Sequence, residues 1–474
     1  MNIKTIFKTI ILAVFFLSTL YLVIDIPIIF NSPDESANFL FSREVAATGM
    51  PRISEQRNED LHGLLGPRSM SSVKDSLVPT SFLGMPVVFG ALGSVFGIFF
   101  MLIITPILSI LTVLAWRSII LQMFKKIFIA DVSAFLFMIH PAFWYYSGRT
   151  MMHNVAFLSF LIFGVWFAFR QSKHHVDFIL AGLCIGLALA FRTSEVMWVL
   201  PSCAAILFIV RRHTSWEQRI VFFASVLLAL IPFMLFNNAL YGSVLTTGYQ
   251  ADLSAVPFSD SQSIEVIQYD DEESLLARVT GLILPFGFHE KAILRHVWQY
   301  GVALYPWMSI LSLIGMVLLF YRCENIVHRD RWKWMLGVTF LLSVWLGIFY
   351  GSWTFHDNPD PTIFSLGNSY VRYWLPLFLL STPFAALALF QLSRWLRVSR
   401  ARYAVIGLLL CIMTALSTQL VFFGDDGFIP TRRALYSFAE KRSVILENTM
   451  EDSIVIVDRA DKFVFPHRSV IQPL

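Results

Sequence analysis

The sequence is poor in charge and in cysteine. Lys, Arg, Asp and Glu make up only 14% of its 474 residues, and the spacing of its four cysteines fits neither a metal site nor a disulfide framework. The sequence contains no GxxxxGK[ST] loop and no strand-linked GxGxxG, so we do not expect ATP-driven chemistry. Any energy for a reaction must then come with the substrate.

Long apolar runs dominate the chain instead. Hydrophobic residues make up 56% of it, and many runs approach or exceed the roughly 18 residues typical of a membrane helix. Backbone polar groups must pair internally in lipid, so the sequence predicts an all-α polytopic membrane protein. We expect eleven spans, near residues 7–30, 97–116, 127–146, 154–169, 177–191, 194–210, 220–237, 300–321, 334–352, 373–390 and 404–423.

The first run, near residues 7–30, resembles a signal peptide only in its position. It follows Lys4 and Lys8, but it is too long for a signal-peptide core and lacks a small-residue cleavage site. We expect it to be an uncleaved first helix.

The loops between the spans alternate in charge. One set is short, basic and nearly free of acids, which by the positive-inside rule predicts cytoplasmic loops and a cytoplasmic N-terminus. This set holds Lys4, Lys8, Arg117, Lys125, Lys126, Arg170, Lys173, Arg211, Arg212, Arg219, Arg322, Arg329, Arg331, Lys333, Arg394, Arg397, Arg400 and Arg402. The outer side then carries loops 31–81, 238–299 and 353–372. We divide the chain into a membrane domain, 1–423, and a small outer-face tail, 424–474, in which "SIVIVD" indicates a short α/β element.

The run at 82–98 is apolar enough to be a further span. A single crossing there would invert every later loop and place the basic loops outside. We therefore expect a membrane-surface or re-entrant segment, and thirteen spans is the alternative that also preserves the sidedness.

The stretch "NSPDESANF" opens the first outer loop. Ser32 suits an N-cap, Pro33 the first helical position, and Glu35 completes a capping box, so a helix is predicted to about Thr48, where Gly49 stops it. Its apolar residues predict an amphipathic helix lying in the membrane interface.

Asp34 is not needed for this cap. An acid in the first turn does favour the helix dipole. A carboxylate at the exit of a membrane span can also act as a general base, and partial desolvation would raise its pKa toward that role.

Several stretches of the sequence resemble one family of membrane enzymes. The first is "PDESANFLFSREVAATGMP", and others follow at 78–97, 140–154, 186–201, 237–249 and 370–378. In order, spacing and sidedness they resemble the GT-C glycosyltransferases, especially the family-39-like branch with the protein O-mannosyltransferases and the lipid A aminoarabinose transferases. The resemblance implies a GT-C-like helical bundle that takes a sugar from a polyprenyl-phosphate donor at the outer membrane face.

The resemblance also implies roles for the two first-loop acids. The aspartate of the family's acidic pair, Asp34 here, would accept the proton of an acceptor hydroxyl that attacks the anomeric carbon. Polyprenyl phosphate would leave, with inversion at that carbon. Glu35 would assist in binding or only cap the helix. The sequence identifies neither the sugar nor the acceptor, which in this superfamily is a lipid, a glycan or a protein.

A phosphate leaving group needs cations that stabilise its developing charge. The outer side offers Arg149, Arg192, Arg372 with Tyr373 beside it, Lys74 and His356. An arginine at a span end can instead snorkel to the interface, and Arg192 can pair with Glu195 at i+3. The resemblance places Arg372 near the lipid-phosphate pocket and Lys74, more loosely, where a phosphate-contacting lysine lies.

The chain departs from the family in the stretch "SGRTMMHN". Members often carry a second acidic residue there, whereas this chain has His153 and Asn154. One His and one Asp do not make a metal site, so we expect catalysis without a metal or other cofactor, with a divalent ion as the less favoured alternative. We expect His153, Asn154, Tyr249 and His289 to contact the acceptor or to line the cavity.

Two other functions fit an outer cavity. A flippase for a lipid-linked sugar would be expected to show paired halves, and no repeat is visible. An O-antigen-type polymerase or ligase would use a lipid diphosphate donor. The compact loops favour a multi-pass protein of a bacterial inner (plasma) membrane, with its site on the periplasmic or extracellular face.

Overall fold

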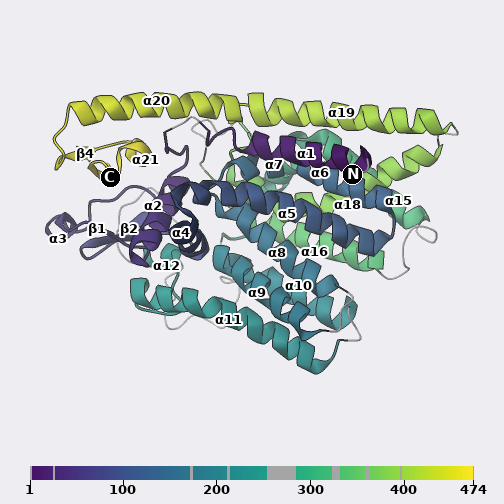
Figure 1. Ribbon diagram of the computed structural model, residues 1–474, viewed down its shortest axis with the longest axis horizontal. Coiled ribbons are helices and arrows are strands. Elements are labelled where there is room, and N and C mark those ends of the chain that lie inside the picture. Colours follow the sequence, from purple (N-terminus) through teal and green to yellow (C-terminus); the bar gives the residue numbers. More distant parts are fainter. Residues whose placement is uncertain are drawn as a thin grey trace.

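The structure is a computed structural model, and it describes residues 3–24, 27–170, 174–210, 214–252, 284, 286–322, 331–355, 357, 363–395 and 398–472. Most of these residues are helical (Figure 1). The predicted all-α class is therefore confirmed. Most of the outer loop 238–299 lies outside the described residues.

Among the described residues the helices of the bundle form eleven units, and each unit overlaps one of the predicted spans. They are α1 (Ile3–Thr19), α5 (Ile98–Phe124), α6 (Ile127–Met138) with α7 (Pro141–Gly148), α8 (His153–Phe169), α9 (His175–Phe191), α10 (Val196–Ala205) with η2 (Ile206–Val210), α11 (Trp216–Tyr241), α15 (Pro306–Arg322), α16 (Arg331–Gly351), α18 (Leu375–Trp395) and α19 (Ser399–Phe423).

Length divides these helices into two groups. Among the described residues, four helices are long and apolar enough to cross a membrane, and two bent pairs raise that number to six. The others are shorter apolar helices. The protein is thus membrane-embedded, while the count of eleven crossings stays a prediction.

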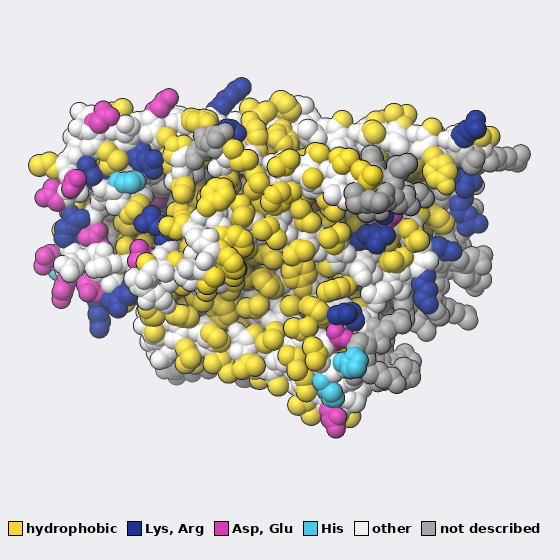
Figure 2. Space-filling model, in the orientation of Figure 1, with side chains coloured by type: hydrophobic (Ala, Val, Ile, Leu, Met, Phe, Trp, Pro, Cys, Tyr) yellow, Lys and Arg dark blue, Asp and Glu magenta, His cyan; other side chains and the backbone are white. Residues whose placement is uncertain are grey.

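Side-chain types divide the surface into three zones (Figure 2). Hydrophobic side chains fill the middle of the face shown, Lys and Arg predominate at its right-hand end, and both charge signs mix at its left-hand end. Exposed apolar side chains such as Leu227 and Leu313 belong to the helices of the middle zone. We call the right-hand end the basic end; there Asp131 bonds Lys8 at 2.8 Å and Arg117 at 2.5 Å.

The left-hand end, which we call the loop end, consists of the first loop and the C-terminal tail. The first loop contributes α2 (Pro33–Thr48), α3 (Arg57–Asp60) and a small antiparallel sheet of order β1-β3-β2, with β1 at Ile53–Ser54, β2 at Met70–Val73 and β3 at Ser76–Pro79. The short helices α12 (Gly248–Asp252), α14 (Glu290–His296), η1 (Thr193–Glu195), η3 (Val297–Ala303) and α17 (Ser369–Tyr373) come from later connections.

The run at 82–98 forms a short helix, α4 (Gly84–Phe96). Its 13 residues extend about 20 Å, which is less than the roughly 30 Å of a bilayer core. At Gly97, where φ is +89°, the chain turns into α5. This geometry agrees with a segment that does not cross by itself.

Helix α2 is more buried than an interfacial helix would be. Helix α4, strand β3 and the tail all contact it. Ala37, Leu40 and Phe41 belong to an apolar core that also contains Leu77 of β3 and Phe463 of the tail. Its apolar side chains therefore pack on neighbouring protein, while its position at the membrane interface stays a prediction.

The tail, residues 424–474, forms α20 (Phe428–Glu447), β4 (Ile454–Ile456), α21 (Asp461–Val464) and β5 (Ser469–Ile471). β4 and β5 pair in parallel, so the expected small α/β element is present. It docks on the first loop through Arg68, whose Nη2 lies 2.7 Å from the fully buried carboxylate of Asp461. Since the tail shares its core with the first loop, the two fold as one unit.

The bundle depends on close backbone contact where α15 crosses α18. A Cβ on Gly315 would overlap the backbone carbonyl of Phe384, and a backbone carbonyl cannot rotate away as a side chain can. We expect Gly315→Ala to lower the free energy of unfolding by about 1–3 kcal/mol, measured by thermal unfolding in detergent. Gly407 is the matched control, because it lies in helix α19 with open space around it. Gly407→Ala should be neutral or stabilising, and equal losses in both variants would refute the close contact.

Candidate functional site

The site begins at the first turn of α2. Ser32 is the N-cap, Pro33 is the first helical residue, and Gly49 ends the helix in a left-handed conformation with φ of +81°. The Glu35 carboxylate accepts from the Ser32 backbone N–H at 3.4 Å, and Ser32 Oγ accepts from the Asp34 N–H at 3.3 Å. The predicted capping box and both helix ends are confirmed.

Glu35 also forms a buried ion pair with Arg149. Arg149 Nε donates to both carboxylate oxygens at 2.9 and 3.0 Å, and Nη2 donates to Oε2 at 2.5 Å. Arg149 Nη1 donates to the phenol oxygen of Tyr145, Oη, at 2.6 Å. These bonds join α2 to the end of α7, and they occupy the guanidinium that the sequence offered for the lipid phosphate.

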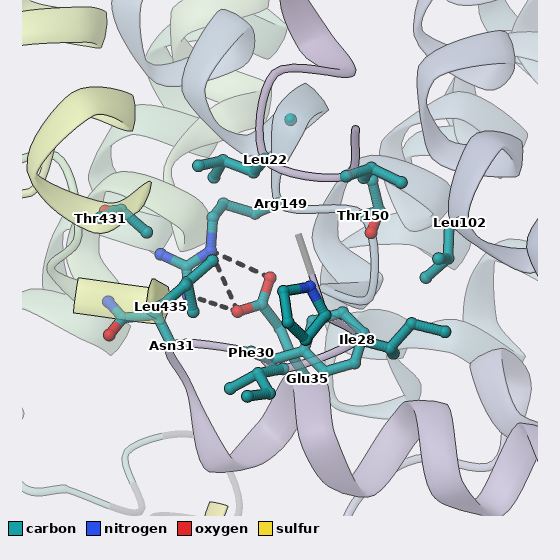
Figure 3. A pocket seen from close by; sticks show the side chains of 14 residues that line it. Leu22, Ile28, Phe30, Asn31, Glu35, Leu102, Arg149, Thr150, Thr431 and Leu435 are labelled. Atoms are coloured by element: carbon teal, nitrogen blue, oxygen red, sulfur yellow. Dashed lines mark hydrogen bonds and ion pairs between the residues drawn. The ribbon is translucent and has the colours of Figure 1, made fainter. Parts of the chain in front are cut away.

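A hollow that is open to solvent lies beside this pair (Figure 3). Its lining is mostly apolar, with Ile28 and Phe30 from the connection into α2, Leu102 from α5 and Leu435 from α20. Figure 3 shows the Glu35 and Arg149 side chains pointing toward each other at this hollow. The pair neutralises its own charge, so the hollow presents an apolar surface rather than a free cation.

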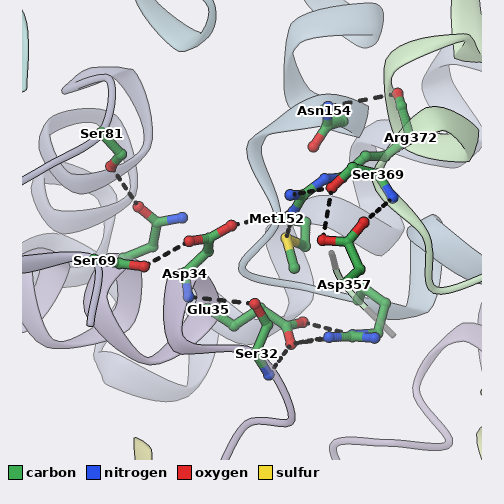
Figure 4. Close-up of polar contacts among 12 residues, drawn as sticks. Ser32, Asp34, Glu35, Ser69, Ser81, Met152, Asn154, Asp357, Ser369 and Arg372 are labelled. Atoms are coloured by element: carbon green, nitrogen blue, oxygen red, sulfur yellow. Dashed lines mark hydrogen bonds and ion pairs between the residues drawn. The ribbon is translucent and has the colours of Figure 1, made fainter. Parts of the chain in front are cut away.

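Asp34, one residue earlier, has a different set of partners (Figure 4). Ser69 Oγ donates to Oδ1 at 2.6 Å, and Arg372 Nη1 donates to Oδ2 at 3.1 Å. The Asp34 side chain is 26% exposed and the Arg372 side chain 13%. The structure thus brings together an acid from α2 and a cation from α17, and both are residues that the sequence analysis proposed for the site.

The environment of Asp34 lowers its pKa. Burial raises the pKa, but the Arg372 charge, the Ser69 hydrogen bond and nearby His153 together lower it to a greater extent. The expected raised pKa is therefore wrong for this resting arrangement, because Arg372 stabilises the carboxylate. Asp34 is ionised at neutral pH.

Arg372 is held by a short network on α17. Its Nη2 donates to Ser369 Oγ at 2.8 Å, and Ser369 N in turn donates to the Asp357 carboxylate at 2.7 Å. The Arg372 guanidinium also lies 5.1 Å from the centre of the Tyr373 ring. Its Nε is buried and lacks a hydrogen-bond partner within the described chain.

Arg192 lies on the other side of Tyr373. Its guanidinium is 4.4 Å from the centre of that ring, so the ring stands beside both arginines. The predicted alternative of an internal pair is present: Arg192 Nη2 lies 2.8 Å from Glu195 Oε1. Arg192 Nη2 also donates to Tyr350 Oη at 2.7 Å.

His153 and Asn154 begin α8 next to Arg372. His153 lies near enough to Arg192, Asp34 and Arg372 to interact with their charges. Asn154 Nδ2 donates to the Arg372 carbonyl at 3.4 Å, while Asn154 Oδ1 and His153 Nδ1 are buried without a partner among the described residues. A buried polar atom left unpaired is costly, which points to a polar ligand or water at this place.

Tyr249 of α12 lies within range of the charges of Asp34, Arg372 and Arg192. Its ring contacts Phe82 at a centroid distance of 5.0 Å, and Phe82 contacts the His153 ring at 5.9 Å. The structure therefore places Tyr249, His153 and Asn154 at one site, as the sequence predicted, though their roles stay predictions.

Three other predicted residues do not join this group. Lys74 is exposed at the tip of the β2–β3 hairpin, at the far end of β2 from Ser69. A four-residue strand spans about 13 Å, so Lys74 does not share the contacts of Ser69 with Asp34. His289 is exposed at the N-cap of α14. His356 lies outside the described residues.

Among the residues that the structure describes, no group of three or more His, Cys, Asp or Glu side chains is arranged to hold a metal ion. The expected catalysis without a metal therefore stays a prediction from the sequence.

Several supporting residues were missed by sequence reasoning. Ser369 stands three positions before Arg372 in a short helix, so its spacing was a usable signal. Ser69 and Tyr350 carried none, because they come from distant segments. Lys462 of the tail was also missed: its Nζ donates to the Asn31 carbonyl at 2.8 Å, and Ser36 Oγ donates to the Lys462 carbonyl at 3.2 Å. Burial lowers the pKa of Lys462 to about 8. The tail thus holds the start of α2 from both sides of its cap.

Comparison with known proteins gives a match in structure alone. No protein-family model and no curated sequence matches the chain. Crystal structures of ArnT from Cupriavidus metallidurans, one bound to undecaprenyl phosphate and one in the apo state, match with TM-scores of 0.53 and 0.55. The chain has the ArnT fold.

The match to ArnT is nearly complete in length and low in identity. It covers 99% of this chain and 85% or 86% of ArnT, at 9% sequence identity. The GT-C-like helical fold that the sequence resemblance implied is therefore confirmed, at the level of the fold. At 9% sequence identity the match assigns neither a reaction nor a role to any residue of this chain.

The two ion pairs on α2 should respond differently to the loss of their arginine. Arg149→Met would leave Glu35 charged, buried and unpaired, so we expect a loss of about 3–5 kcal/mol in the free energy of unfolding. Arg372→Met should cost no more than about 1 kcal/mol, because Asp34 keeps Ser69 and reaches solvent. Thermal or denaturant unfolding in detergent measures both. Equal losses of stability in the two variants would contradict the assignment of Glu35–Arg149 as the buried pair and Asp34–Arg372 as the solvent-accessible pair.

Proposed function

We propose that the protein is a membrane glycosyltransferase that moves a sugar from a polyprenyl-phosphate donor to an acceptor hydroxyl at the loop end. The observation that carries this proposal is the contact between the Asp34 carboxylate and the Arg372 guanidinium, 3.1 Å apart, on a bundle with the ArnT fold. A carboxylate suits proton removal from a hydroxyl, and a guanidinium suits a phosphate.

The donor lipid is proposed from two observations. One of the ArnT structures contains undecaprenyl phosphate, a polyprenyl phosphate, so this fold can hold such a lipid. In the present chain, Arg372 keeps a buried Nε–H without a partner among the described residues. Arg372 is therefore our choice for the phosphate contact, with Arg192 behind Tyr373 adding positive potential.

The chemistry needs one bond formed and one broken. The acceptor oxygen attacks the anomeric carbon as its proton passes to Asp34, and the bond from that carbon to the phosphate oxygen breaks. The electron pair leaves with polyprenyl phosphate, whose added negative charge Arg372 stabilises. A single displacement of this kind inverts the anomeric carbon. The unpaired Asn154 Oδ1 and His153 Nδ1 are suited to hydroxyl groups of the bound sugar.

We propose that the loop end faces the periplasm of a bacterial inner membrane and that the N-terminus is cytoplasmic. The predominance of Lys and Arg at the opposite end supports this orientation (Figure 2). A lipid-borne donor would then reach Asp34 at the outer surface of the membrane.

Replacing Asp34 tests the proposed reaction. We expect Asp34→Asn to reduce sugar transfer by about 10²–10⁴-fold, because the amide cannot accept the proton, while undecaprenyl phosphate still binds. The purified protein would be assayed with undecaprenyl-phosphate-linked sugars and a lipid extract as acceptor, with products detected by mass spectrometry. Asp75→Asn is the control, since Asp75 is an exposed acid paired with Arg52 on the hairpin.

Three outcomes would contradict this proposal. Full transfer by Asp34→Asn would remove Asp34 as the base. Movement of labelled lipid-linked sugar across a vesicle membrane without a covalent product would indicate a flippase instead. Release of a lipid diphosphate rather than a monophosphate would indicate a polymerase or ligase.

A further inference from the structure

Three arginine–carboxylate pairs surround the candidate site, and they differ in strength. Glu35–Arg149 is joined by three short bonds with side chains 3% and 6% exposed. Glu195–Arg192 is 4% exposed on both sides and is tied further by Tyr350. Asp34–Arg372 is joined by one hydrogen bond of 3.1 Å, with side chains 26% and 13% exposed. It is therefore the pair that an incoming anion can open.

Arg372 also has donors to spare. Nη1 is shared between Asp34 and the thioether of Met152, which is a weak acceptor. Nε is buried and unpaired within the described residues. A phosphate offers several charged oxygens to such a planar fork and forms stronger, bidentate bonds. The phosphate is thus a better partner for Arg372 than the single Asp34 oxygen.

The groups that face Asp34 decide what the loss of Arg372 would do. They are Arg372 from α17, His153 from α8, Ser69 before β2, and Tyr249 from α12. Arg372 has the largest lowering effect on the pKa of Asp34. Ser69 is a neutral donor and would remain. Without Arg372, burial raises the pKa of Asp34, and the carboxylate becomes a stronger base.

We propose that Arg372 is exchanged from Asp34 to the phosphate of the lipid donor, so that Asp34 becomes an effective base only when the donor is bound. The proposal rests on the function proposed above. During transfer the acceptor proton moves to Asp34 as polyprenyl phosphate leaves on Arg372. When that lipid departs, Arg372 returns to Asp34, and the proton is released to water. Arg372 therefore positions the donor and controls the base with the same side chain.

The exchange predicts that phosphate binding is linked to proton uptake by Asp34. Binding of undecaprenyl phosphate to the full-length protein in detergent would be measured by titration calorimetry at mildly acidic pH, in buffers of different ionisation enthalpy. We expect the wild type to take up more protons per lipid than Asp34→Asn, by up to one proton. The lipid titrates equally in both experiments, so the difference reports Asp34.

Three further variants make the test specific. In Arg372→Met no arginine can leave Asp34 when the lipid binds, although Ser69 still donates to its carboxylate. Adding Asp34→Asn to Arg372→Met should therefore leave the number of protons taken up per bound lipid unchanged. Arg52→Met is the matched control, because Arg52 pairs with exposed Asp75 at the same end of the protein, and it should retain the wild-type uptake. Where transfer can be assayed, both kcat and kcat/KM should fall at low pH as Asp34 becomes protonated. In the wild type this fall should occur at higher pH for kcat than for kcat/KM. In Arg372→Met the two falls should occur at the same pH.

The outcomes separate this inference from the proposed function. Tight binding of undecaprenyl phosphate with equal proton uptake in wild type and Asp34→Asn would overturn the exchange while leaving the transferase intact. Failure of the wild type to bind undecaprenyl phosphate would instead reject the proposed function. An unchanged difference in proton uptake in the Arg372→Met background would also overturn the exchange, because Arg372 would then not control Asp34.

Discussion

The buried contact between Glu35 and Arg149 is the interaction on which the candidate site depends. It fastens the first turn of α2 to the end of α7 through three short bonds, with both side chains almost completely removed from solvent. A helix end is normally the part of a helix that frays, since its first N–H groups lack partners. Here the capping box and the ion pair hold that end in place. The neighbouring carboxylate of Asp34 therefore has a fixed position.

The consecutive acids Asp34 and Glu35 divide the work between them because a helix turns by about 100° per residue. Glu35 points to Arg149 and the apolar hollow, whereas Asp34 points to Ser69 and Arg372 (Figures 3 and 4). Glu35 is paired in a buried position, whereas Asp34 is paired where its side chain still reaches solvent. The tail contributes to the same end by bonding Asn31 and Ser36 on either side of the cap. In the function that we propose, Glu35 positions the turn and Asp34 reacts, so the two roles fall on different residues of one turn.

Electrostatics around Asp34 explain why the sequence-based pKa expectation was wrong. The sequence showed an acid at the exit of a span, where loss of water would raise the pKa. It did not show that Arg372, 338 residues later, bonds this acid and reverses the shift. The same kind of long-range contact removed Arg149 from the set of free cations. Lys74 and His289 have side chains that suit a phosphate or sugar site, but both are exposed. Strand and loop geometry places them away from Asp34 and Arg372.

The sequence by itself determined the features that depend on neighbours in the chain. The bounds of α2 followed from Ser32, Pro33, Glu35 and Gly49, since caps act within four residues, and the apolar runs placed the bundle helices because burial in lipid requires continuous hydrophobic length. Only the tertiary structure decided which arginine meets which acid. Arg149 and Glu35 are 114 residues apart, and no local pattern distinguishes their pairing from that of Arg372 with Asp34. That choice is made by helix packing, which sets the distances over which charges interact.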